Sequence, residues 1–90
     1  MDPSLAWVHY NLALHLAKVP GRMTEALAHG EAALALRPNY LEARNMLGIL
    51  HAQSGQVEAA RAQWNEALRI DPSFTPAREN LKRLEQGDER

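Results

Sequence analysis

A spacing of 34 residues between like residues recurs along this chain and constrains its fold more than any other feature. Four pairs share this spacing: Gly21 with Gly55, Ala26 with Ala60, Ala33 with Ala67, and Pro38 with Pro72. Upstream, Leu12 matches Leu47 at a spacing of 35, so the first copy holds one extra residue. A fixed period of this length predicts helical units that stack and bury their apolar faces against their neighbours.

Prolines and glycines divide the chain into five segments that are each expected to form a helix. These segments cover residues 4–18, 24–36, 41–53, 57–70 and 75–86. Nothing alternates with a period of two and β-branched residues are few, so no strand is expected. The short connections predict antiparallel neighbours in an all-α fold. We expect one domain over residues 1–90, with repeat one at 6–40, repeat two at 41–74, a capping helix at 75–86 and a tail at 87–90.

Composition excludes several classes of function. The chain has no cysteine, which excludes disulfides, thiolate catalysis and cysteine-ligated zinc. Its net charge of −1, with acidic residues interleaved among the arginines, argues against a nucleic-acid surface. No apolar run is long enough to span a membrane, so direct membrane contact is not expected. The chain is expected to lie in the cytoplasm or to be a soluble tail of a larger protein.

The second copy carries the pattern of a known repeat. It holds Leu47-Gly48, then Ala60 with Trp64, then Ala67 and Pro72. The chain therefore resembles the tetratricopeptide repeat family, whose period is the same. The first copy matches less well, because Gly30 replaces the aromatic residue and His9 replaces a tryptophan.

This resemblance implies a right-handed superhelix of two helix-turn-helix repeats plus a C-terminal capping helix. It also implies a non-enzymatic module that binds a protein or peptide on its concave face. The best-known carboxylate clamp of the family is not expected here, because its places hold residues unsuited to gripping carboxylates: Tyr10, Leu14, Met46, Pro76 and Asn80.

Carried over by position, the concave face combines an apolar wall with an amide-bearing wall that suits a peptide with bulky anchors. Its expected residues are Trp7, Tyr10, Leu14, Ala17, Lys18, Glu42, Asn45, Ile49, Ala52, Gln53, Glu79 and Arg83. Of these, Asn45 and Gln53 are expected to hydrogen-bond the peptide backbone. The alternative is that Trp7, Tyr10 and Leu14 are core residues.

The two ends of the chain differ in polarity. The last helix carries a thin apolar line among charged residues, as a solubilising cap does. The first helix is apolar almost all round, which is typical of a helix buried on all sides. Three explanations stay open: the chain is the tail of a longer repeat protein or enzyme, it forms a homo-oligomer through Trp7, Tyr10 and Leu14, or these residues are half exposed.

Neither catalysis nor a metal site is expected, and no cofactor is implied. The serines lie at helix starts and turns, where capping explains them, and no phosphate-binding glycine-rich loop is present. His9 and His15 are six residues apart and so face different sides of one helix, while His29 and His51 belong to different helices. Glu25 and His29 are expected to pair on the surface, and His51 to be buried.

Packing is expected to differ between the repeats. Small residues at fixed places should let the helices approach closely, while Leu12, Leu47 and Trp64 fill the remaining space. Gly30 removes an aromatic side chain from repeat one, which predicts a vacancy there unless Trp7 or Tyr10 fills it.

Overall fold

The computed structural model describes residues 2 and 4–88, and no strand occurs among them. Five helices follow one another: α1 (Leu5–Ala17), α2 (Met23–Leu36), α3 (Leu41–Gln53), α4 (Val57–Ile70) and α5 (Thr75–Asp88). The all-α prediction is confirmed. The predicted end of the last helix at residue 86 is wrong, because α5 continues through Gly87 to Asp88. A glycine weakens a helix by only about 1 kcal/mol and does not by itself end one.

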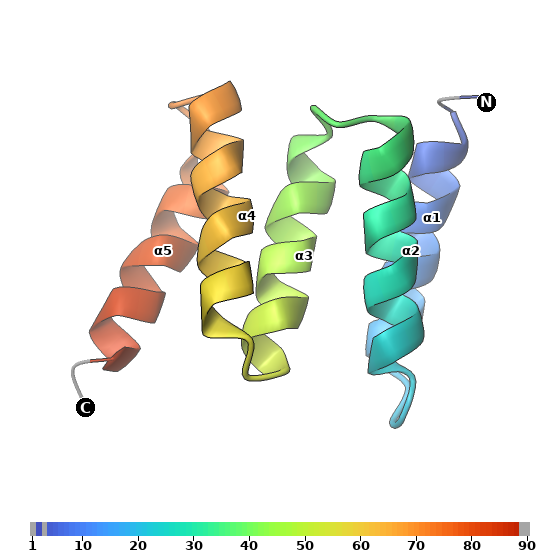
Figure 1. Cartoon of the computed structure of the whole chain (residues 1–90), viewed down its shortest axis with the longest axis horizontal. Coiled ribbons are helices and arrows are strands. Elements are labelled where there is room, and N and C mark those ends of the chain that lie inside the picture. The colour runs from blue at the N-terminus through green and yellow to red at the C-terminus, as the bar shows by residue number, and fades with distance from the viewer. Residues whose placement is uncertain (1, 3, 89–90) are drawn as a thin grey trace.

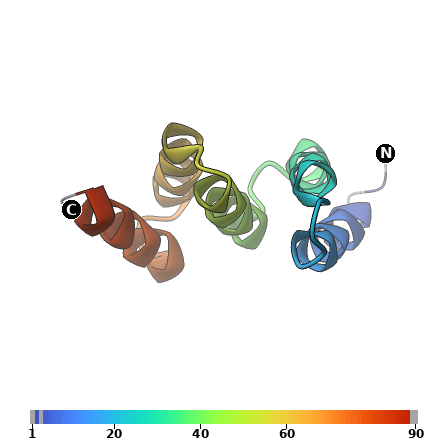
Figure 2. The same ribbon diagram turned by 90° about the horizontal axis from the view of Figure 1, so that it is seen from below.

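The helices form a shallow array that is extended in two directions and thin in the third. Its extents are 42 × 32 × 16 Å. Figure 1 shows consecutive helices running in opposite directions, so that α1, α3 and α5 are parallel to one another. Seen from below, α2 and α4 lie on one side of the array and α1 and α5 on the other (Figure 2).

The turn between the two helices of each repeat explains why Gly21 and Gly55 recur 34 residues apart. Gly21 precedes α2 and Gly55 precedes α4, with φ angles of 82° and 78°. Glycine adopts this left-handed conformation without the steric penalty that a Cβ imposes. The two glycines therefore recur because each hairpin reverses direction in the same way.

Alanines recur at two more of these positions because the helices cross closely there. Four of them have no exposed surface: Ala26, Ala33, Ala60 and Ala67. Each belongs to one of the buried clusters that join α1, α2 and α3 or α3, α4 and α5. A methyl group at these places allows neighbouring helices to pack at short range.

The predicted vacancy at Gly30 is filled by the following repeat. A Cβ built on Gly30 would stand 2.7 Å from Cδ2 of Leu47 and 3.2 Å from Cε of Met46. Leu47 belongs to α3 and is fully buried. Neither Trp7, which is 62% exposed, nor Tyr10 fills this space, so the expectation of a hole is wrong.

In repeat two, the space beside a glycine is filled by a side chain of the same repeat. Gly48 of α3 faces the indole of Trp64 from α4, and a Cβ on Gly48 would lie 2.5 Å from Cε2 of that ring. Trp64 is buried, and its Nε1 donates a hydrogen bond to the backbone oxygen of Asn45 at 3.3 Å. The absence of a side chain at Gly48 is therefore what admits the indole.

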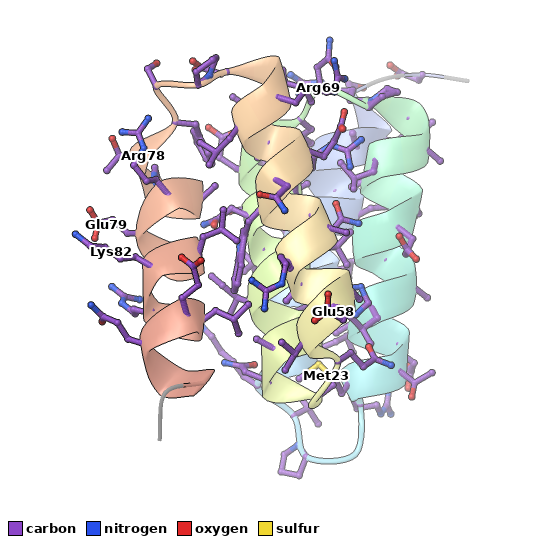
Figure 3. The ribbon with its side chains drawn as sticks, turned by 60° about the vertical axis from the view of Figure 1, so that its left-hand side comes forward. Met23, Glu58, Arg69, Arg78, Glu79 and Lys82 are labelled. Atoms are coloured by element: carbon purple, nitrogen blue, oxygen red, sulfur yellow. The ribbon has the colours of Figure 1, made fainter. Side chains whose placement is uncertain are left out.

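The outer surface of α5 is polar. Arg78, Glu79 and Lys82 are exposed and point away from the array (Figure 3), whereas Ala77 is completely buried against α4. This distribution gives the C-terminal end of the array a charged face in contact with water.

Candidate functional site

Two hollows lie on the face formed by α1, α3 and α5. The α1–α3 hollow has a volume of about 290 Å³, and the α3–α5 hollow has a volume of about 260 Å³. Ile49 and Gln53 of α3 line both of them. The hollows are therefore neighbours along one surface, separated by a single helix.

The α1–α3 hollow is lined from both helices. Helix α1 contributes Tyr10, Leu14 and Ala17, which are spaced as one helical face, and Lys18 follows directly after the helix. Helix α3 contributes Glu42, Asn45, Met46, Ile49, Leu50 and Gln53. The floor is apolar, because Met46 and Leu50 are buried, and polar side chains stand at the rim.

Tyr10 is held in place by a second tyrosine. The rings of Tyr10 and Tyr40 pack with their centroids 5.3 Å apart at an angle of 41°. Burial raises the pKa of Tyr10, and the nearby carboxylate of Glu42 raises it further. The hydroxyl of Tyr10 therefore stays protonated at neutral pH and can donate a hydrogen bond to a ligand.

Opposite charges lie at the two ends of the α1–α3 hollow. Glu42 is in the first turn of α3, whereas Lys18 directly follows the last residue of α1. Because α1 and α3 are parallel, these charges are separated along the helix axes (Figure 1). A ligand in this hollow meets a negative group at one end and a positive group at the other.

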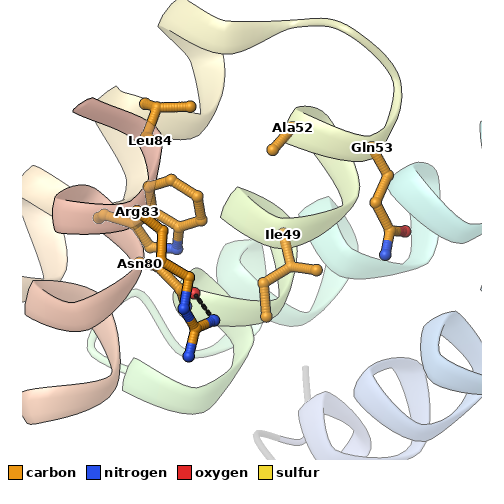
Figure 4. A pocket seen from close by; sticks show the side chains of 7 residues that line it. Ile49, Ala52, Gln53, Asn80, Arg83 and Leu84 are labelled. Carbon is orange, nitrogen blue, oxygen red and sulfur yellow. Dashed lines mark hydrogen bonds between the residues drawn. The ribbon is translucent and has the colours of Figure 1, made fainter. Parts of the chain in front are cut away.

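The exposed surface of the α3–α5 hollow is mostly apolar, although Gln53, Asn80 and Arg83 also line it. Figure 4 shows Ile49 and Ala52 of α3 across from Leu84 of α5, and the buried indole of Trp64 also lines this hollow. The chemistry of these side chains suits a second apolar group rather than a charged one.

A chain of hydrogen bonds links α5 to α3 beside the hollows. Nη1 of Arg83 donates to Oδ1 of Asn80 at 3.2 Å, and Nδ2 of Asn80 donates to Oδ1 of Asn45 at 2.8 Å. The first of these bonds is drawn in Figure 4. The side-chain oxygen of Asn45 therefore already accepts a hydrogen bond, and Asn45 also lines the α1–α3 hollow.

The structure brings most of the predicted groove residues together and leaves two outside. Tyr10, Leu14, Ala17, Lys18, Glu42, Asn45, Ile49 and Gln53 line the α1–α3 hollow, and Ala52 and Arg83 line the α3–α5 hollow. Trp7 and Glu79 line neither hollow.

Trp7 and Glu79 lie outside the two hollows for simple geometric reasons. Trp7 lies a turn before Tyr10, beyond the end of the hollow. Helix α5 turns Asn80, Arg83 and Leu84 toward the hollow, and Glu79 is rotated about 100° from Asn80. The spacing of these three residues at i, i+3 and i+4 is the sequence signal that identifies the correct face.

The outward surface of α1 carries a separate apolar stripe. Leu5, Val8 and Leu12 are 46%, 42% and 41% exposed, so the prediction that Leu12 fills the core is wrong. Their equivalents in repeat two are Tyr40, which directly precedes α3, and Ala43 and Leu47 of α3. All three are buried in one cluster with Ala33 and Leu34 of α2. In repeat two, α2 covers the surface of α3 that corresponds to this stripe. In repeat one, the stripe on α1 is exposed.

The histidine contacts differ from those expected. His29 of α2 contacts His9 of α1 through their Nδ1 atoms, and Glu25 pairs instead with Arg22 at 3.2 Å. His51 is half-buried and contacts Oε1 of Gln56 at 2.6 Å. Spacing along one helix could not reveal the contact between His9 and His29, because it joins two helices.

Within residues 2 and 4–88, no cluster of three or more potential metal ligands is present. In the same part of the chain, none of the helices has the length and apolar character needed to cross a membrane. A family model for the tetratricopeptide repeat matches residues 20–85, which is most of the chain. The match covers α2, α3, α4 and most of α5, and includes both glycine turns.

Proposed function

Because the chain belongs to the tetratricopeptide repeat family, whose repeats are generally protein-interaction modules, we propose that it binds an extended peptide across its two hollows. The observation that carries this proposal is the pair of adjoining hollows on the face of α1, α3 and α5, with Ile49 between them. In this proposal the protein acts as a non-enzymatic binding module.

The chemistry of the lining describes the peptide. Each hollow accepts one bulky apolar side chain, since both floors are formed by apolar groups. The amide of Asn45 and the exposed amide of Gln53 can bind the peptide backbone at the rim. A basic residue is favoured near Glu42 and an acidic residue near Lys18, because opposite charges attract along the groove.

Selection from a library of random displayed peptides would test this function. We expect enriched sequences to share two apolar anchors and to bind Ile49→Ala at least about tenfold more weakly, the loss that 1.4 kcal/mol produces. Asn45→Ala should also weaken binding. Asn65→Ala is the matched control, because Asn65 is an exposed asparagine on α4, and it should bind as the unaltered chain does.

Circular dichroism and unfolding curves would show that each variant remains folded. Enriched peptides that bind Ile49→Ala and Asn45→Ala as tightly as the unaltered chain would contradict the groove proposal.

Self-association through α1 is a second candidate function, favoured by the exposed stripe of Leu5, Val8 and Leu12. In each copy α2 is already covered by α3 and α4 by α5, so neither is free to cover α1 of another copy. We therefore infer that a dimer would pair α1 with α1 of the partner about a two-fold axis.

Mass measured by light scattering over a range of concentrations would test this dimer. We expect Leu12→Glu to reduce the mass to that of one chain, because a buried carboxylate would oppose the contact. Trp7→Glu should have less effect, since Trp7 lies off the stripe. A monomer at every concentration would exclude self-association.

A further inference from the structure

A carboxylate and an aromatic ring come together at one end of the α1–α3 hollow. Glu42 of α3 and Tyr10 of α1 both line this hollow. Burial raises the pKa of Tyr10 and the charge of Glu42 raises it further, so the carboxylate lies near the ring. Glu42 is exposed, and its carboxylate has no hydrogen-bond or ion-pair partner within residues 2 and 4–88. The negative charge at this end of the hollow is therefore free to meet a ligand.

The ring of Tyr10 belongs to a stack that already holds one guanidinium group. Tyr10 packs on Tyr40 with the ring centroids 5.3 Å apart, and Cζ of Arg37 lies 4.5 Å from the centroid of the Tyr40 ring. Tyr40 is buried and does not line the hollow, whereas Tyr10 does. The face of an aromatic ring attracts a cation. Tyr10 is thus the ring of this pair that a cationic ligand in the hollow can reach.

Resting on the proposed peptide-binding function, we propose that this end of the α1–α3 hollow selects an arginine side chain of the bound peptide. The guanidinium group lies against the ring of Tyr10 and donates hydrogen bonds to the carboxylate of Glu42. Arginine fits better than lysine, because a planar guanidinium group can stack on a ring while it donates two parallel hydrogen bonds to a carboxylate.

The α3–α5 hollow lacks both of these groups. In the repeat register, Asn45 takes the place of Tyr10 and Pro76 takes the place of Glu42. Arg83 also lines the α3–α5 hollow, so a positive charge there opposes a second cation. The peptide is therefore oriented across the array, with its arginine toward α1 and an apolar anchor toward α5.

The position of Glu42 in α3 has a second effect that needs no ligand. Glu42 lies in the first turn of α3, where a negative charge interacts favourably with the positive end of the helix dipole. Replacing Glu42 therefore alters stability slightly whether or not a peptide binds. For this reason the test measures which peptides are selected rather than how stable the variant is.

Parallel selections from a library of random displayed peptides would test the arginine site. The unaltered chain should enrich peptides that carry an arginine at a fixed distance from an apolar anchor. Glu42→Gln should lose the preference for arginine and keep the preference for the apolar anchor. Glu31→Gln is the matched control, because Glu31 is an exposed glutamate of α2 outside both hollows, and it should select as the unaltered chain does.

An enriched peptide, synthesised with arginine, lysine or methionine at the selected position, would measure the contribution of each group. We expect the arginine peptide to bind most tightly and the methionine peptide least tightly. Glu42→Gln should bind the arginine peptide about fivefold more weakly, as the loss of about 1 kcal/mol produces. Tyr10→Leu should also bind it more weakly, whereas Tyr10→Phe keeps the ring and should bind as the unaltered chain does. The Glu42→Gln result does not depend on whether Tyr10→Leu folds.

The outcomes separate this inference from the proposed function. Failure to enrich any peptide would contradict the peptide-binding function and the arginine site with it. Enriched peptides without a selected arginine would overturn the arginine site alone. So would a preference for arginine that persists on Glu42→Gln, or equal binding of the arginine and lysine peptides.

Discussion

In repeat two the indole of Trp64 occupies the space beside Gly48, whereas in repeat one the side chain beside Gly30 comes from outside the repeat. Gly30 and Trp64 are equivalent positions, 34 residues apart. One repeat closes itself with a large side chain from its own second helix. The other presents a bare backbone, against which Leu47 and Met46 of α3 pack.

The difference shows that a missing side chain in a stacked repeat need not leave a cavity. Each repeat contacts its neighbour over a whole helix face, so the neighbour can supply the missing volume. Leu47 belongs to repeat two by sequence, yet its side chain fills the space beside Gly30 in repeat one. The stability of repeat one therefore depends on a side chain of repeat two. Repeat one is therefore expected to depend on repeat two more than repeat two depends on repeat one.

Removing the side chain of Leu47 should have the largest effect on stability. We expect Leu47→Ala to lower the free energy of unfolding by about 2–5 kcal/mol, because a fully buried leucine is lost and a cavity is left. Urea unfolding followed by circular dichroism would measure this loss. A near-neutral result would contradict both the register of α3 and the dependence of repeat one on Leu47.

Adding a methyl group at each glycine should distinguish the two repeats. We expect Gly48→Ala to lower the free energy of unfolding by about 1–3 kcal/mol, because the rigid indole of Trp64 cannot yield and its hydrogen bond to Asn45 is displaced. Gly30→Ala should cost less, since the better helix propensity of alanine offsets part of the clash. Unfolding curves for the two variants, measured side by side, would compare these losses.

Combining Gly30→Ala with Leu47→Ala would sharpen this result. The double variant should be more stable than the sum of the two single effects predicts, because the alanine at 30 then enters space that Leu47 has vacated. Additive effects of the two changes would mean that Leu47 does not occupy the space at Gly30.

The smallest expected effect on stability concerns Asp71 and Arg37, the residues that follow α4 and α2. Oδ1 of Asp71 accepts hydrogen bonds from the backbone N–H and the hydroxyl of Ser73 at 3.0 and 2.7 Å, and these bonds lower the pKa of Asp71. A carboxyl whose pKa is lower in the folded state stabilises the fold above its unfolded pKa. This contribution is lost as the pH falls through the lowered folded pKa.

Asp71→Asn should therefore reduce the melting temperature slightly at neutral pH and not at all in strong acid. The equivalent residue of repeat one is Arg37, which lies over the ring of Tyr40 at 4.5 Å. Arg37→Gln should show no such dependence in the acid range, because the guanidinium keeps its charge there. Thermal unfolding at a series of pH values would compare the two variants.

The helices could be predicted well from the sequence because their boundaries depend on local signals. Gly21 and Gly55 mark the hairpin turns, and the 34-residue period fixes how the helices correspond. The last boundary could not be predicted in the same way, because Gly87 resembles the end of a helix that continues past it.

Contacts between helices are harder to predict. The predicted residues of α1 from Tyr10 to Lys18 line one hollow, whereas on α5 the hollow is lined by Asn80, Arg83 and Leu84 and not by the predicted Glu79. The role of Glu79 in binding stays a prediction. The contact of His9 with His29 also escapes prediction, although the repeat register pairs those positions with Arg44 and Gln63. Spacing gives the side of a helix, whereas only the crossing of two helices decides which side chains meet.

The space at Gly30 also limits how this array can be rearranged. A repeat whose core is filled by its own side chains can be duplicated, deleted or moved along the array without loss of a core side chain. The first repeat here is not such a unit, since whatever helix follows it must present a leucine and a methionine at the places of Leu47 and Met46. The packing of Leu47 and Met46 against Gly30 thus requires repeat two to follow repeat one.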